Sequence, residues 1–93
     1  MDADARFRAA PEVTWRDVPG ELLLFDARAD RYHVLNEAAA EVWRRLVEGA
    51  SLATIAAALA EQFDVDEAAM RADISEAAGD FLARGLLIAL DTR

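Results

Sequence analysis

The stretch "RYHVLNE", residues 31–37, joins a strand pattern directly to a helix pattern. Residues 31–35 have the period-two alternation that is typical of a strand with two different faces. Asn36 is a good helix N-cap, and Glu37 lies in the first turn, where the helix dipole favours an acid. The stretch therefore predicts a short strand that ends where a helix begins.

Two further strands are predicted before this stretch. Residues 13–18 alternate in polarity, while residues 21–27 contain a continuous apolar run that is typical of a strand covered on both faces. Pro19-Gly20 and residues 28–30 supply the two turns. Three short strands with tight connections predict an antiparallel meander.

Three helices are predicted after Asn36. The first ends at Gly49, Ser51 caps the second, and Asp66 caps the third, which ends at Arg84-Gly85. Each helix has an apolar stripe at helical spacing, formed by Ala39, Val42, Trp43 and Leu46, by Leu52, Ile55, Ala56, Leu59 and Phe63, and by Met70, Ile74, Ala77, Phe81 and Leu82.

The predicted fold class is α+β. It is winged helix-turn-helix-like, with a three-stranded antiparallel sheet followed by three helices and a short strand at residues 86–90. Residues 1–11 are expected to form a flexible N-terminus, and residues 12–90 a single domain.

Composition narrows the class of partner. The 93 residues carry a net charge of −8, every positive charge is an arginine, and there is no cysteine. A negative field repels phosphate backbones, so a basic peptide or protein surface is favoured over nucleic acid. No apolar run approaches the roughly 20 residues that span a bilayer. We therefore expect a cytoplasmic protein that binds no membrane.

Catalytic and metal chemistry find little support in the sequence. His33 is the only histidine, and no cysteine is present to assist it. Asp73, Glu76 and Asp80 share one helical face, where they can form a metal or acid–base site or a solvated face, and the solvated face is the commoner case. The four glycines form no phosphate-binding loop. We expect no enzyme activity, cofactor or metal.

The chain resembles the PqqD-like family over about residues 12–88. The resemblance rests on a combination of short motifs in a fixed order, none of them diagnostic alone. These are Leu35-Asn36-Glu37, Gly49, Ile55-Ala56-Ala57-Ala58-Leu59, Asp73-Ile74 and Arg84-Gly85-Leu86.

The resemblance implies a binding module that recognises the leader segment of a ribosomally synthesised precursor peptide and presents it to a modifying enzyme. The leader is expected to add a strand beside residues 31–35 and to lie in a groove against the third helix. The peptide-binding residues so implied are Arg31, Tyr32, His33, Val34, Leu35, Asp73, Ile74, Glu76, Ala77, Ala78, Asp80 and Phe81.

Two features of the third helix bear on the leader's chemistry. Its acids would attract basic residues in the leader, chiefly tuning the association rate. Ala77, Ala78 and Gly79 stand where bulkier residues are expected in the family. They predict either a wider pocket for a large leader side chain or close helix packing, and both readings remain open.

Alternative functions are also open. A winged-helix DNA-binding regulator fits the fold, although the third helix offers only Arg71 and Arg84 among several acids. An adaptor that dimerises through its edge strand is a second alternative, since an unliganded edge can pair with a second copy. Within the leader-binding interpretation, the partner enzyme is a lasso-type leader peptidase or a radical enzyme.

Overall fold

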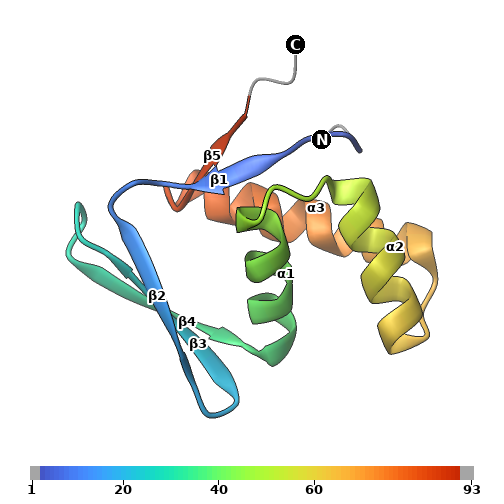
Figure 1. Ribbon diagram of the computed structural model, residues 1–93, viewed down its shortest axis with the longest axis horizontal. Helices are drawn as coiled ribbons and strands as arrows, with labels where there is room; N and C mark the ends of the chain where they lie inside the picture. Colours follow the sequence, from blue (N-terminus) through green and yellow to red (C-terminus); the bar gives the residue numbers. More distant parts are fainter. Residues whose placement is uncertain (1–2, 91–93) are drawn as a thin grey trace.

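The computed structural model describes residues 3–90, which fold into two small sheets and three helices (Figure 1). Strands β2, β3 and β4 form an antiparallel sheet in that order, and β1 pairs with β5. The elements are β1 (Phe7–Ala9), β2 (Val13–Val18), β3 (Glu21–Asp26), β4 (Arg31–Asn36), α1 (Glu37–Val47), α2 (Leu52–Phe63), α3 (Glu67–Ala83) and β5 (Leu87–Ala89).

The three helices lie on one side of the three-stranded sheet (Figure 1). Leu22 and Leu24 of the central strand β3 face the helices and are fully buried, whereas Leu23 and Phe25 are only partly buried. The prediction that β3 is covered on both faces is therefore wrong. A continuous apolar run indicates burial, but it cannot show that a layer is present on only one side.

All three predicted helix caps are confirmed. The side chains of Asn36, Ser51 and Asp66 accept hydrogen bonds from the backbone N–H groups three residues later, at 2.9, 3.2 and 3.0 Å. Each bond satisfies a donor that the first helical turn leaves unpaired. At Asn36 the cap also ends β4, so strand and helix meet without a connecting loop.

Trp43 of α1 lies at the centre of the core and is fully buried. The ring of Trp15 from β2 meets it edge to face at 5.5 Å, and the ring of Phe81 from α3 at 5.2 Å.

Three expected core positions differ from prediction. On α1, Ala40 is buried and the expected Ala39 is only partly buried. Phe63 at the end of α2 is 46% exposed, and Ala78 rather than Ala77 is fully buried on α3.

The N-terminal segment contains a strand that the sequence did not predict. Phe7 is 2% exposed, and β1 pairs with β5 in the register Phe7 to Ala89. Residues 7–9 of the segment expected to be a flexible N-terminus thus form β1, and residues 1–2 of that segment lie outside the described part of the chain. The partner strand is some 80 positions away, so three residues of local pattern could not reveal the pairing.

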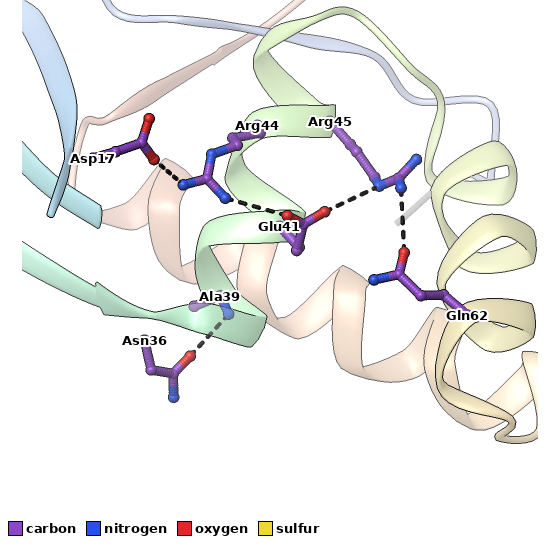
Figure 2. Close-up of polar contacts among 7 residues, drawn as sticks. All are labelled: Asp17, Asn36, Ala39, Glu41, Arg44, Arg45 and Gln62. Atoms are coloured by element: carbon purple, nitrogen blue, oxygen red, sulfur yellow. Dashed lines mark hydrogen bonds and ion pairs between the residues drawn. The ribbon is translucent and has the colours of Figure 1, made fainter. Parts of the chain in front are cut away.

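A row of polar contacts connects α1 to β2 and α2 (Figure 2). Arg44 pairs with Asp17 of β2 and, at 3.2 Å, with Glu41 of its own helix. Glu41 also pairs with Arg45 at 3.8 Å, and Arg45 reaches Gln62 of α2 at 3.5 Å. Pairs at this level of exposure contribute little stability singly. Together they link the sheet, α1 and α2 on one side of the molecule.

No helix within residues 3–90 is long and apolar enough to cross a bilayer.

Candidate functional site

Strand β4 is an edge of the three-stranded sheet. Among the described strands it pairs only with β3, so its other side presents backbone donors and acceptors without a strand partner. Its side chains alternate. His33 and Leu35 stand opposite the buried Leu24 and Leu22, whereas Tyr32 and Val34 point away from the helices and are 66% and 59% exposed.

A groove runs between β4 and the C-terminal half of α3. Its volume is about 330 Å³, and its apolar floor is formed by Phe81 and Leu86, which are 4% and 1% exposed. We call it the β4–α3 groove, and its lining consists of Tyr32, His33, Val34, Leu35, Asp80, Phe81, Arg84 and Leu86. The unpaired edge of β4 and the apolar floor of the groove therefore lie side by side.

Arg84 links the two walls of this groove. Its Nε lies 3.1 Å from Oδ2 of Asp80, and its Nη1 lies 3.4 Å from Nδ1 of His33 on β4. The side chains of Arg84 and Asp80 are 53% and 56% exposed, so water screens the pair and its net contribution to stability is small. A ligand with its own charges can therefore displace these contacts at low cost.

The acids of α3 border a second hollow next to the groove. Asp73, Glu76 and Asp80 line it together with Ala77, and Asp80 belongs to both hollows. These carboxylates form an acidic rim along the exposed side of α3. Within residues 3–90 no cluster of histidine, aspartate and glutamate side chains could hold a metal ion. Three carboxylates along one exposed side of a helix favour the approach of a basic ligand.

A third hollow opens between the three helices and is almost entirely apolar. Its volume is about 310 Å³, comparable with a site for one large side chain, and it shares Asp73 and Ala77 with the acidic rim. We call it the helical pocket, and its lining consists of Ala38, Ala39, Val42, Leu59, Phe63, Met70, Asp73, Ile74 and Ala77.

The three hollows follow one another along α3, each sharing a lining residue with the next, and we call this row of hollows the trough. The trough runs from Arg84 at the end of the helix, past the acidic rim, to Met70 near its start. Its chemistry changes along this path from mixed polar, through acidic, to apolar. A chain in extended conformation lying in the trough would meet the three environments in that order or its reverse.

Most of the predicted site residues come together along the trough. Tyr32, His33, Val34, Leu35, Asp80 and Phe81 line the β4–α3 groove, and Asp73, Glu76, Ala77 and Ile74 line the hollows beyond it.

Two predicted site residues do not line the trough. Ala78 is fully buried in the core and lines none of the three hollows. Arg31 is exposed at the start of β4, opposite Asp26, and lies beside the groove. Of the proposed small-residue patch, only Ala77 faces the trough, because residues 77 and 78 differ by about 100° around a helix.

Sequence reasoning missed the residues that complete the trough. Arg84 was assigned only to the helix end, although a cation beside an apolar floor is also a binding feature. Ala38 and Ala39 form one wall of the helical pocket. Small side chains on a helix surface leave space, and the alanine run after Asn36 was the available signal. Its meaning depends on α2 and α3 packing beside it, which no local pattern gives.

The family model described as "Coenzyme PQQ synthesis protein D (PqqD)" matches residues 21–87. The chain belongs to the PqqD family. The matched range begins at β3 and includes β4, all three helices and the start of β5, so it contains both walls of the trough. A comparison with curated proteins finds no match.

Two solved structures share the fold. One, described as lasso peptide synthetase B1 complexed with the leader peptide, is 28% identical, has a TM-score of 0.84, and the alignment covers 89% of this chain and 98% of that one. The other, TbiB1 in complex with the TbiA(beta) leader peptide, is 20% identical with a TM-score of 0.81, covers 86% and 93% of the two chains, and shows the likeness of fold alone.

Proposed function

We propose that this PqqD-family protein binds the leader segment of a ribosomally synthesised precursor peptide and presents it to a modifying enzyme, without catalysing a reaction itself. The observation that carries the proposal is the unpaired edge of β4 beside an apolar-floored groove. Support comes from the structural relative that is 28% identical, lasso peptide synthetase B1, which is complexed with a leader peptide.

Strand addition to β4 accounts for the geometry. An extended leader pairs its backbone with residues 31–36 and gains affinity from main-chain hydrogen bonds. Alternate leader side chains then point into the β4–α3 groove, above Phe81 and Leu86. The helix that starts at Glu37 ends the strand, so the pairing is limited to one short stretch of leader.

The trough predicts the chemistry of the leader. A basic residue suits the acidic rim of Asp73, Glu76 and Asp80, and a bulky apolar residue suits the helical pocket. Between them the leader must be extended, since both hollows lie along one side of α3. This specificity comes from side chains of all three helices, whereas β4 contacts mainly the leader's backbone.

The modifying enzyme is a lasso-type leader peptidase or a radical enzyme. The structural relative that is 28% identical favours the lasso type. DNA binding is disfavoured, since the exposed side of α3 carries Asp73, Glu76 and Asp80 and the chain's net charge is −8.

A fluorescence titration tests the proposal. Trp43 contacts Phe81, a floor residue of the groove, so occupancy of the groove should change tryptophan emission. The titrants are synthetic leader peptides from any short open reading frame encoded beside the gene, and amide NMR maps the site. We expect saturable binding, with shifts concentrated in residues 31–36 and 70–84.

Two controls keep the titration specific. A scrambled peptide of the same composition retains the charge but loses the order of side chains. A leader with proline in the pairing segment loses a main-chain donor and should bind more weakly. Equal binding of all three peptides, or shifts confined to other parts of the chain, would refute leader recognition at β4.

A further inference from the structure

The sheet has a second surface, on the side away from the helices, that lies apart from the floor of the β4–α3 groove and shares only Tyr32 and Val34 with its lining. It is built from three rows of directly opposed residues across β2, β3 and β4, and the row of Val18, Glu21 and Asn36 borders the other two. We call these other two rows the outer face: Thr14, Phe25 and Tyr32 in one row, and Arg16, Leu23 and Val34 in the other. In Figure 1 no element within residues 3–90 covers this side of the sheet.

The outer face contains a hollow of about 310 Å³ with an aromatic wall. Its lining includes Thr14, Arg16, Leu23, Phe25 and Tyr32, and the rings of Phe25 and Tyr32 pack with centroids 4.7 Å apart. Tyr32 and Val34 are among the most exposed large apolar side chains of the described residues. Exposed aromatic and aliphatic side chains gathered in one place are typical of a protein–protein contact.

The charge of the outer face differs from that of the molecule as a whole. The protein has a net charge of −8, yet the two rows of the outer face contain one arginine and no acid. Within the described part of the chain, the guanidinium of Arg16 makes no hydrogen bond or ion pair, and Glu21 in the neighbouring row does not pair with it. A complementary surface therefore carries a carboxylate flanked by apolar side chains.

The outer face adjoins the proposed leader site without overlapping its floor. Along β4, His33 and Leu35 stand on the helix side and Tyr32 and Val34 on the outer side. Tyr32 lines both the β4–α3 groove and the outer hollow, and Val34 of the outer face also lines the groove. A protein on the outer face could thus contact the module while the leader occupies the trough, and would meet the leader near Tyr32.

We propose that the outer face docks the enzyme that modifies the precursor, through a segment of that enzyme carrying a carboxylate between apolar side chains. This inference rests on the proposed function, because presentation requires a second surface that stays free when the leader is bound. A second copy of this chain is a poorer occupant, since two molecules of charge −8 repel each other.

The test uses charge reversal at Arg16 with a matched control. Arg16→Glu places an acid on the outer face, and Arg8→Glu makes the same change of net charge on β1, in the other sheet. Both residues are exposed, so both variants should fold. A third variant, Leu23→Thr, removes apolar surface from the outer face and keeps a residue suited to strands.

Each variant is assayed twice, for leader affinity by tryptophan fluorescence and for affinity and turnover with the purified enzyme encoded in the same gene neighbourhood. We expect leader affinity within about twofold of wild type in all three variants. Enzyme affinity should fall about tenfold in Arg16→Glu and Leu23→Thr but not in Arg8→Glu. Wild-type enzyme affinity in Arg16→Glu and Leu23→Thr would overturn the inference.

Two further outcomes would assign the outer face to a different occupant. Loss of leader binding in Arg16→Glu would assign the outer face to the leader, and a wild-type dimer in sedimentation that Arg16→Glu dissociates would assign it to a second copy. Either result overturns the inference while leaving leader recognition intact. Failure of wild-type protein to bind any leader would instead remove the proposed function, and the inference with it.

Discussion

The two edges of the three-stranded sheet, β2 and β4, are both unpaired among the described strands, yet their surroundings differ. Beside β4 lies α3, with the groove floor of Phe81 and Leu86 and the acidic rim beyond. β2 instead borders α1, and a hollow at the end of β2 is lined by Val18 together with the charged Glu37, Glu41 and Arg44 of α1. Asp17 of β2 pairs with Arg44 of α1, and Arg16 points outward.

This difference shows what makes an edge strand a binding site. Free backbone groups at a strand edge can pair with any extended chain. They therefore promote unspecific association unless neighbouring side chains select the partner. Charged residues such as Arg16 and Asp17 oppose strand pairing at β2. At β4 the neighbouring helix provides pockets that select one partner. The predictions below test whether the trough and edge act together, in order of decreasing effect.

Filling the trough should have the largest effect. Ala77→Phe places a large ring where the acidic rim meets the helical pocket, and leader affinity should fall at least about thirtyfold, or roughly 2 kcal/mol. Fluorescence titration measures the affinity. Ala57→Phe, at an exposed position of α2, is the matched control and should bind normally. Full leader affinity in a folded Ala77→Phe variant would show that the leader avoids this part of α3.

Removing the cap that joins β4 to α1 should have an intermediate effect. Asn36→Ala leaves the N–H of Ala39 without its side-chain acceptor and should lower the free energy of unfolding by about 1 kcal/mol in urea titrations. Asp66→Ala removes the equivalent bond at α3 and should cost a similar amount. Leader affinity should fall more in Asn36→Ala, because only this cap ends the docking strand. Equal leader affinity in the two variants would show that the Asn36 cap does not contribute to the leader site.

Neutralising one acid of the rim should have the smallest effect. Glu76→Gln should slow association with a basic leader about threefold and weaken its salt dependence, with little change in dissociation. Stopped-flow fluorescence at two salt concentrations measures both rates. Glu61→Gln, an exposed position on α2, makes the same charge change away from the trough. If both variants slow association equally, the rim acts only through the net charge of the protein.

Much of the fold follows from local sequence. Asn36, Ser51 and Asp66 cap helices because each side chain can reach a donor three residues on, which needs no distant contact. The alternation in residues 31–35 places His33 and Leu35 on one face for the same local reason. The β4 edge and most of its groove residues could therefore be predicted, because the family resemblance implied that the leader pairs with residues 31–35.

The remainder depends on contacts between distant parts of the chain. Phe7 is buried because β5 lies beside β1, and Leu23 is partly exposed because helices cover only one side of the sheet. Whether Ala77 or Ala78 faces the trough is set by how α3 rotates against α1 and α2. The helical pocket likewise exists only after three helices pack. Patterns within one element contain none of this information.

Amide hydrogen exchange at the two sheet edges, with and without saturating leader peptide, tests the central claim most directly. The claim is that the leader becomes a strand on β4 and leaves β2 free. It predicts that amides in residues 31–36 which exchange readily in the free protein become at least tenfold slower, while those in residues 13–18 do not change. Protection in residues 13–18, or none in residues 31–36 at saturation, would contradict it.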